Sequence, residues 1–525
     1  MMNKIFTEKI YLRLILLLGT TLRIFNLGKN SLWSDEAGFM QFRMGGILDS
    51  LKYSWSRIIL AKADMGTPAF SFFAAFWSNL VQGEFMLRLS SAIVGIVCIL
   101  LIYQLGKILF GYKVGIISAF LLALSPFHIY YSQEFRMYSL ITLLSIASTI
   151  FLVKFLETEK KRFLFGYVIS HIWNIYFHIT TSLILFAHVI YFIIYKKKYR
   201  YLLKKWLIGH LIIIVSLLPE IVLIISSVKQ NSWNYFTSTT ISTVSELGST
   251  SAIIPFYTFK NFCVGYNATA SIWLPASLLF FMLVIFAVIK TNNKRILHIC
   301  LLCFLIPISV MYAAQKFIYA DRFLISSSVF LYLIAGNGIY LLKRPFLVFA
   351  MISFFCFFSL VNYYKDYLPG ALEQRIAVHS KKSHREAAIY LLNNFQEDDI
   401  IFHTQPNTSL PLQYYFNYFR EDKRNYSLDK YPYTLILRFS EGDREEEELL
   451  PTEIWAKDMP YRVDRSDVVS VKGHKRVWLV FSAREFNQAL YPNSYEQRIL
   501  RWLDKHYRKK DIKYFRGIYL YLYVL

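Results

Sequence analysis

The sequence predicts a polytopic α-helical membrane protein with a small α/β domain at its C-terminus. The chain has 525 residues, of which 55% are hydrophobic and 18% aromatic, and its mean hydropathy is +0.37. Apolar runs that suit bilayer crossing recur from residue 11 to about residue 361 and then stop. The polar stretch that follows, about 160 residues long, has the size of one domain.

About eleven apolar segments are predicted to span the membrane. These are residues 10–27, 87–108, 113–129, 138–156, 163–178, 181–196, 206–227, 270–290, 296–314, 322–341 and 345–362. The apolar segment 67–81 is expected to be interfacial or re-entrant, because a span there would move the basic loop at Lys160 to the outside. Residues 1–365 are therefore assigned to the membrane domain and residues 366–525 to a soluble domain.

Charge fixes the predicted orientation. The chain has a formal net charge of +23, which indicates basic cytoplasmic loops rather than nucleic-acid binding. The basic clusters placed in the cytoplasm are 160–162, 196–200, 294–295 and 343–344. Counting spans from them places several polar segments on the outer face with the soluble domain, namely Asp35 and Glu36, residues 131–138, His178, residues 229–271 and residues 315–322. We expect these segments to converge on a shared cavity.

An acidic pair, Asp35 and Glu36, follows the first predicted span directly. Carboxylates at the edge of a span are costly to keep near hydrocarbon, so they indicate a functional site. Two solvated loop acids are the alternative. The pair also offers oxygen ligands that suit Mg²⁺ or Mn²⁺.

A second polar segment, residues 125–140, lies between two predicted spans with no polar spacer. Pro126 is expected to end or kink the helix before it. Glu134 and Arg136 follow, and charged residues at membrane depth usually line a cavity. An ion pair between Glu134 and Arg136 that holds two helices together is the alternative.

Three further residues are candidates on the outer face. Arg322 opens a span, and its planar fork suits phosphate recognition, although arginines at helix ends also snorkel to the interface. Lys316 is a weaker candidate for the same role. His178, at the outer end of a span, could bind a phosphate, a metal or an acceptor. The alternative is a structural histidine whose hydrogen bonds are made between helices.

Several chemistries lack support in the sequence. No phosphate-binding glycine loop, zinc-protease motif or nucleophile elbow is present in the membrane half. The five cysteines suggest neither a disulfide framework nor a zinc site. A pump or carrier would be expected to have charged residues in mid-span or paired broken helices in two repeats, and no internal repeat is found.

The motifs resemble those of the GT-C membrane glycosyltransferases. The closest group is the glycosyltransferase family 39 type, which includes protein O-mannosyltransferases and the aminoarabinose transferases of lipid A. The stretches that carry the resemblance are Arg23 with residues 31–36, the helix start at 67–68, residues 87–95 and residues 125–140. The likeness weakens through residues 319–324. Residues 66–68 lack the basic or histidine residue that many relatives have there, which affects any metal or phosphate contact at that point.

The resemblance implies a hexosyl- or pentosyltransferase that uses a polyprenyl-phosphate-linked sugar. Asp35 would be the general base for an acceptor hydroxyl, with Glu36 sharing or tuning that role. Arg136, Lys316, Arg322 and His178 would bind the donor phosphate, and Glu134 would lie in the same site. The reaction would invert the anomeric carbon at the outer face of a bacterial inner membrane. The acceptor would be a glycan, lipid or protein, with no nucleotide, no nucleic acid and no required metal.

The C-terminal segment alternates predicted helices with predicted strands, which indicates a small α/β domain. Helices are predicted at 383–392, with a capped start, and at 495–506, and strands at 399–403, 434–438, 476–481 and 517–523. The acidic run 441–448 is expected to be a solvated loop or the start of a helix. No catalytic constellation is found in this segment. A non-catalytic translocator or binding protein for lipid-linked glycans is the alternative to an enzyme.

Overall fold

The computed structural model describes residues 2–40, 46–59, 68–229, 253–314, 319–368, 382–396, 399–403, 406–419, 434–436, 475–482 and 495–525. The chain forms two compact units. The membrane unit consists of Met1–Leu27, Asp64–Phe70 and Phe85–His379, and the C-terminal unit of Gly28–Ala63, Ser71–Glu84 and Ser380–Leu525. The segment that carries the acidic pair therefore belongs with the C-terminal residues.

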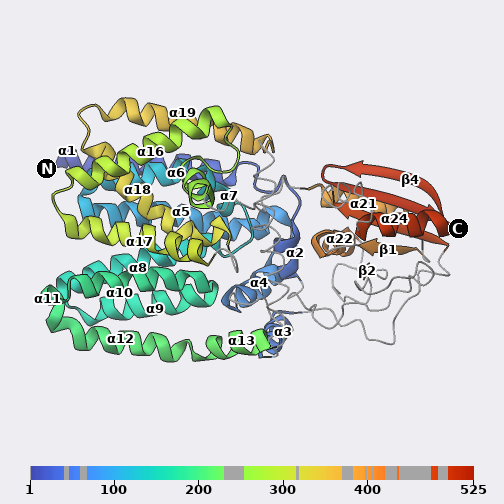
Figure 1. The fold of residues 1–525 in the computed structure, drawn as a ribbon, viewed down its shortest axis with the longest axis horizontal. Helices are drawn as coiled ribbons and strands as arrows, with labels where there is room; N and C mark the ends of the chain where they lie inside the picture. Colours follow the sequence, from blue (N-terminus) through green and yellow to red (C-terminus); the bar gives the residue numbers. More distant parts are fainter. Residues whose placement is uncertain are drawn as a thin grey trace. The chain divides into compact units, whose positions relative to one another are not determined.

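The membrane unit is a bundle of helices that run side by side (Figure 1). Its α-helices are α1 (Met2–Ile24), α5 (Gly83–Phe110), α6 (Tyr112–Leu124), α7 (Pro126–Ser132), α8 (Tyr138–Thr158), α9 (Lys161–Phe177), α10 (Ser182–Ile194), α11 (Lys196–Tyr199), α12 (Leu203–Ser216), α13 (Leu218–Lys229), α15 (Ile254–Val264), α16 (Ala270–Lys290), α17 (Lys294–Ala313), α18 (Ile325–Tyr340) and α19 (Pro345–Tyr364). Short 3-10 helices lie at Ile179–Thr181, Arg200–Leu202 and Asp321–Leu324. Each predicted span coincides with one helix or with consecutive helices.

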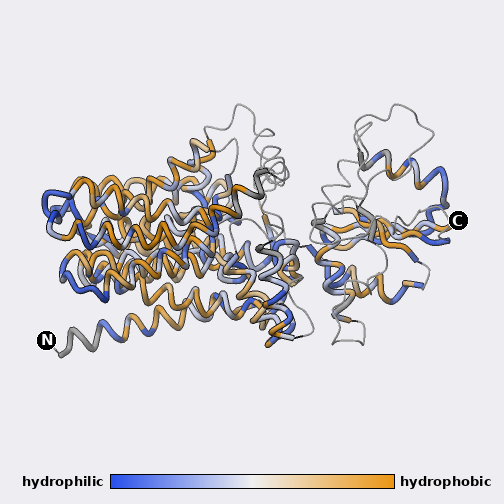
Figure 2. The backbone as a smooth tube through the Cα atoms, turned by 90° about the horizontal axis from the view of Figure 1, so that it is seen from below, coloured by the Kyte–Doolittle hydropathy of each residue, from blue (hydrophilic) through white to orange (hydrophobic). Residues whose placement is uncertain are grey.

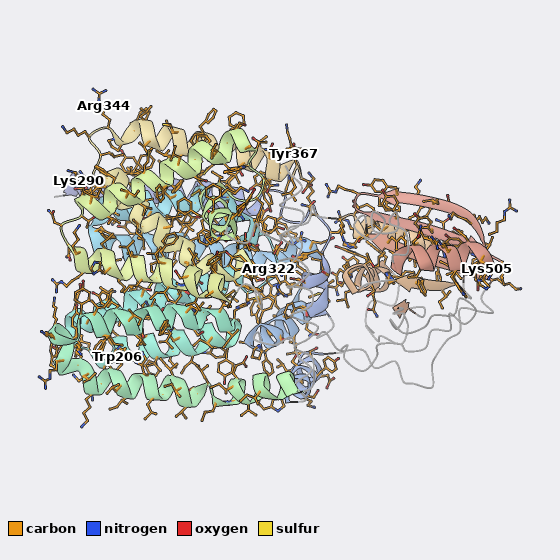
Figure 3. All side chains as sticks on the ribbon, in the orientation of Figure 1. Trp206, Lys290, Arg322, Arg344, Tyr367 and Lys505 are labelled. Carbon is orange, nitrogen blue, oxygen red and sulfur yellow. The ribbon has the colours of Figure 1, made fainter. Side chains whose placement is uncertain are left out.

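Length and composition support the multi-pass assignment. Among the described residues, six helices are long and apolar enough to cross a membrane, and up to eight if each of two bent helix pairs forms one span. Hydrophobic residues follow the helices of this unit, and hydrophilic residues lie in the loops at their ends (Figure 2). Lys290 and Arg344, from two predicted cytoplasmic loops, lie at one end of the unit, and Arg322 and Tyr367 lie toward the other (Figure 3).

The first bent pair confirms the predicted effect of Pro126. Helices α6 and α7 meet at an angle of 62°, with Pro126 in the first turn of α7. A proline has no N–H to give, so carbonyls of the preceding turn need other donors. The buried guanidinium of Arg23, in α1, donates to the carbonyls of Leu122 at 3.0 Å and Ala123 at 3.2 Å.

Helix α18 lies at the centre of the bundle. Within Asp321–Tyr340, which is α18 with the short 3-10 helix before it, 89% of the most apolar 18-residue stretch is buried. Two glycines allow close approach of its neighbours. A Cβ at Gly336 would lie 2.6 Å from the Ser118 hydroxyl, and one at Gly338 would lie 2.5 Å from the Leu283 carbonyl oxygen. Small residues at such crossings let membrane helices pack backbone to backbone.

The C-terminal unit contains a five-stranded sheet with the order β2-β1-β3-β5-β4. Its strands are β1 (Ile400–His403), β2 (Thr434–Ile436), β3 (Arg476–Ser482), β4 (Arg508–Phe515) and β5 (Ile518–Val524). Strand β1 pairs in parallel with β2 and β3, and β5 pairs antiparallel with β3 and β4. The remaining helices are α2 (Ser34–Met40), α3 (Ile47–Ile59), α4 (Pro68–Leu80, whose first turn belongs to the membrane unit), α21 (His384–Asn394), α22 (Pro406–Phe419) and α24 (Tyr495–His506).

Alternating side chains of the sheet build two packed faces. One face packs on α24 through a buried cluster that includes Phe402, Leu479 and Leu503. Trp478 points to the opposite face, where its ring contacts Tyr390 of α21. The sheet therefore lies between helices, as expected for an α/β domain.

Most of the predicted C-terminal elements are confirmed, including the helix at 495–506 and four strands. The predicted cap of α21 is wrong in detail, because Ser383 stands at the N-cap but its side chain makes no capping hydrogen bond. Strand β4 and helix α22 were not predicted. Strand β4 is an exposed edge strand rich in lysine and arginine, and α22 contains Pro411. The acidic run 441–448 lies outside the described residues.

Candidate functional site

The acidic pair lies in the first turn of α2, and the two acids differ in environment. The Trp33 carbonyl accepts the first helical hydrogen bond, from the Ala37 N–H at 2.9 Å. The Glu36 carboxylate accepts a hydrogen bond from the Trp33 N–H at 3.3 Å, and Glu36 is fully buried. This is the glutamate half of a capping box. Asp35 is half-buried, so it is the more accessible of the two carboxylates.

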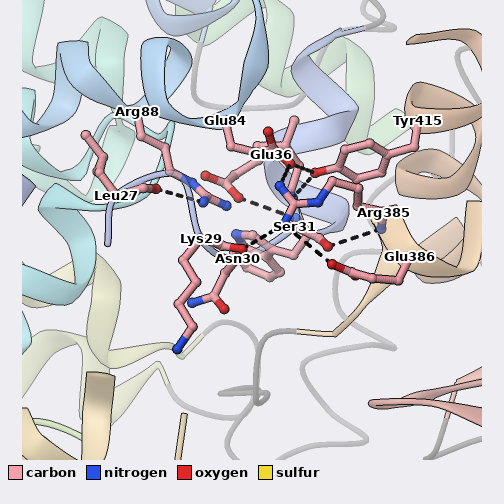
Figure 4. A network of polar contacts seen from close by, with 12 residues as sticks. Leu27, Lys29, Asn30, Ser31, Glu36, Glu84, Arg88, Arg385, Glu386 and Tyr415 are labelled. Carbon is pink, nitrogen blue, oxygen red and sulfur yellow. Dashed lines mark hydrogen bonds and ion pairs between the residues drawn. The ribbon is translucent and has the colours of Figure 1, made fainter. Parts of the chain in front are cut away.

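A polar network fixes the loop that leads into α2 (Figure 4). The Leu32 N–H donates to the Tyr415 hydroxyl at 2.6 Å, which donates to Glu84 at 2.7 Å. Arg385 forms an ion pair with Glu84 at 2.9 Å. Burial, and then the charge of Glu84, raise the pKa of Tyr415 well above its usual value. The hydroxyl therefore keeps the proton that it donates.

Glu134 and Arg136 are both buried in the tight connection between α7 and α8. The Arg136 N–H donates to the Glu134 carbonyl at 2.8 Å, and the Arg136 guanidinium lies 5.8 Å from the centre of the Tyr138 ring. The Arg136 carbonyl accepts from the Ser91 hydroxyl at 3.2 Å, which ties the connection to α5.

His178 and Arg322 meet around Phe323. The His178 ring centre lies 4.7 Å from that of Phe323, and the Arg322 guanidinium lies 5.6 Å from it. Thr180 links His178 to Phe323, since its hydroxyl lies 2.7 Å from His178 Nδ1 and donates to the Phe323 carbonyl at 3.1 Å. The charges of Arg136 and Arg322 both act on His178, so the bundle brings these three residues into one neighbourhood.

The placement of the remaining predicted residues is as follows. Glu134 joins the neighbourhood of Arg322, because both act electrostatically on Tyr131. Lys316 lies outside the described residues, as does Thr67. Asp35 and Glu36 belong to the C-terminal unit and the other four described candidates to the membrane unit. Their convergence on one cavity stays a prediction.

Sequence reasoning missed a buried network beside Arg322. Asp321 accepts hydrogen bonds from the Asn261 side-chain amide at 2.6 Å and the Tyr266 hydroxyl at 2.7 Å. The Tyr266 and Tyr131 hydroxyls lie 2.6 Å apart, and a fully buried Lys260 donates to the Asn261 side chain at 3.1 Å. The available signal was a lysine and an asparagine within the apolar helix α15. The network fixes the first residue of the 3-10 helix that carries Arg322.

The end of α1 is also held by residues to which no role was given. The Gln133 amide nitrogen donates to the carbonyls of Arg23 at 3.0 Å and Phe25 at 2.8 Å. Arg88 donates to the Leu27 carbonyl at 3.1 Å. Arg23 and Arg88 stand in the stretches that carry the family resemblance, so the motifs also serve to terminate the first helix.

No group of three or more histidine, cysteine, aspartate or glutamate side chains that could hold a metal ion occurs within the described part of the chain. All five cysteines are buried and free.

Comparisons with known proteins agree with this architecture. The family model for dolichyl-phosphate-mannose-protein mannosyltransferases matches residues 65–225. No curated protein matches the sequence. ArnT from Cupriavidus metallidurans bound to undecaprenyl phosphate has a similar fold, with a TM-score of 0.55 and 10% identity over 97% of each chain, and its apo state gives the same values. The Archaeoglobus fulgidus oligosaccharyltransferase gives a TM-score of 0.45 and 12% identity over 81% of this chain and 59% of its own.

The family model and the fold confirm the predicted resemblance to the GT-C membrane glycosyltransferases. The fold is that of a multi-pass membrane protein with a small C-terminal α/β domain.

Proposed function

We propose that the protein transfers a sugar from a polyprenyl-phosphate donor to an acceptor hydroxyl, with inversion at the anomeric carbon. Three findings support a lipid-linked donor. They are the family model for a dolichyl-phosphate-mannose-dependent transferase, the shared fold with a protein that binds undecaprenyl phosphate, and the six described helices suited to a bilayer. The observation that carries the proposal is the acidic pair on α2, directly after the first helix of a GT-C-type bundle.

Asp35 acts as the general base. As the acceptor oxygen attacks the anomeric carbon, its proton passes to the Asp35 carboxylate, and a new carbon–oxygen bond forms. The bond between the anomeric carbon and the phosphate oxygen breaks, and the polyprenyl phosphate leaves with the bonding electrons. The half-buried position of Asp35 supports this assignment over Glu36. The capping bond of Glu36 to Trp33 supports a positioning role for that residue.

The phosphate acquires charge as it leaves, and that charge needs cations. Arg136 and Arg322 are the candidates, because both act on the same histidine, His178. The Asp321 network holds the short helix that carries Arg322. Glu134 lies in the same neighbourhood and suits a sugar hydroxyl.

The reaction is assigned to the outer face of a bacterial inner membrane, with a glycan, lipid or protein as acceptor. The positive-inside rule supports this orientation, since the basic loops then face the cytoplasm. Impermeant labelling of a single cysteine introduced at exposed Lys505, in intact cells, tests it. Labelling is expected there and not at a cysteine introduced at Arg344.

The transfer assay uses membranes that contain the full chain and a panel of polyprenyl-phosphate sugars with a radiolabelled sugar. Wild type is compared with Asp35→Asn and with the matched control Asp49→Asn, which removes an exposed acid from α3. We expect label in a new product with wild type and the control, and a loss of at least about 100-fold with Asp35→Asn. Full activity of Asp35→Asn would contradict the base assignment. Lipid movement without a new glycosidic bond would favour the translocator.

A further inference from the structure

Residues 29–32, the loop before α2, are held by side chains that come from distant parts of the sequence. Arg385, at the start of α21, donates to the Lys29 carbonyl at 2.9 Å, and its backbone N–H donates to the Ser31 hydroxyl at 3.1 Å. The Leu32 N–H donates to the Tyr415 hydroxyl of α22 at 2.6 Å, across 383 positions of sequence. Helices α21 and α22 therefore both hold this loop directly.

Glu84 joins the two contacts into one network. Its carboxylate accepts from the Arg385 guanidinium at 2.9 Å and from the Tyr415 hydroxyl at 2.7 Å. The Arg385 and Glu84 side chains are 28% and 12% exposed, so this ion pair is shielded more than a surface pair. Gly83, which precedes Glu84, adopts a φ of +78°, a conformation that favours glycine and sets the start of α5.

The network ends close to the acidic pair. Leu32 and Ser31 are buried, and the next residue, Trp33, provides the carbonyl and the N–H around which the first turn of α2 forms. Helix α2 also packs against α22. A shift of the loop would therefore displace the first turn of α2, in which Asp35 lies.

We infer that Arg385, Glu84 and Tyr415 are positioning residues, through which the C-terminal α/β domain sets the position of Asp35. These residues act through the loop and not on the substrate. The kinetic part of this inference rests on the proposed function of Asp35. The structural part, that the network holds residues 29–40, does not.

Hydrogen exchange of the full chain in detergent tests the structural part. In Tyr415→Phe the Leu32 N–H and Glu84 lose their shared hydroxyl, and in Arg385→Met the loop loses its guanidinium contacts. We expect amides of residues 29–40 to exchange at least about tenfold faster in both variants. Amides of β3 and α18 should keep their protection, which shows that both units remain folded. Arg501→Met, which removes an arginine bonded to Gln497 within α24, is the matched control.

Transfer kinetics test the functional part. Because a displacement of about 1 Å costs on the order of 100-fold in rate, we expect a 10- to 100-fold lower kcat in Arg385→Met and Tyr415→Phe. The KM for the donor should stay within about threefold, since the network does not bind the phosphate. Arg385→Lys keeps a charge for Glu84 but loses the fork, so it should recover part of kcat. Arg501→Met should retain the wild-type kcat.

The two parts fail in different ways. Unchanged exchange of residues 29–40 in both variants would overturn the inference, whatever the enzyme does. Faster exchange with an unchanged kcat would also overturn it, provided that Asp35→Asn is inactive. If Asp35→Asn is fully active, the proposed function fails and exchange alone decides whether the network holds the loop. Should Arg385→Met not fold, Tyr415→Phe, which removes a single oxygen, decides the outcome.

Discussion

Replacement of Gln133 by leucine is expected to destabilise the membrane unit by about 3 kcal/mol. Gln133 is buried at the end of α7. Its amide nitrogen lies near three carbonyls at the end of α1, at 2.8, 3.0 and 3.3 Å, and its oxygen accepts from the Tyr363 hydroxyl at 2.6 Å. An amide nitrogen has two protons, so Gln133 donates at most two of these bonds, and its oxygen accepts the one from Tyr363.

The magnitude follows from these three bonds. Leucine has a similar volume but no polar atom, so the Arg23 and Phe25 carbonyls and the Tyr363 hydroxyl lose the hydrogen bonds that they make with Gln133. Each net hydrogen bond contributes about 1 kcal/mol, which gives about 3 kcal/mol for the three. Because α1 leads into the segment that carries the acidic pair, the transfer activity should fall as well.

Equilibrium unfolding in mixed micelles measures the loss in the free energy of unfolding. The control is Gln497→Leu, in which a half-buried glutamine on α24 loses a bond from Arg501, and it should change stability by less than about 0.5 kcal/mol. A loss below about 1 kcal/mol for Gln133→Leu would refute the view that Gln133 terminates α1.

Three more predictions concern packing, pH and donor binding. Gly338→Ala should cost about 1–3 kcal/mol in the same unfolding assay, because its Cβ would lie 2.5 Å from the Leu283 carbonyl oxygen, whereas Gly46→Ala, with open space around it, should not. Burial lowers the pKa of His403 to about 3, so below about pH 6.5 the unfolded chain binds more protons than the folded chain. The free energy of unfolding therefore decreases as the pH is lowered, by about 2 kcal/mol at pH 5. A His403→Gln variant should lose less stability between pH 7 and pH 5, as measured by its unfolding midpoint, and an unchanged pH dependence would contradict the assignment. Arg322→Lys should raise the KM for the donor about tenfold in the transfer assay, because the planar fork of the guanidinium is lost. An unchanged KM would contradict the assignment of Arg322 to the donor site.

Much of the fold was predictable because it depends on local patterns. Long apolar runs determine membrane helices, since a bilayer requires a fixed length of helix with its backbone bonded internally. The bend at Pro126 follows from the missing N–H of proline. Helix α24 could be predicted because its apolar residues repeat with the helical period, and strands β1 and β3 because each is a short continuous apolar run. Strand β4 lacked that pattern, because it is exposed at the sheet edge.

The candidate site was predictable in its residue types but not in its roles. The sequence by itself determined that Asp35 and Glu36 follow the first helix and that Glu134, Arg136 and Arg322 lie at helix ends. Only the tertiary structure decided that Asp321 holds the helix of Arg322 and that Tyr415 binds the Leu32 N–H. The physical reason is that a buried polar group must find a partner wherever the fold brings one. Such partners lie tens to hundreds of residues away, where no local pattern specifies them.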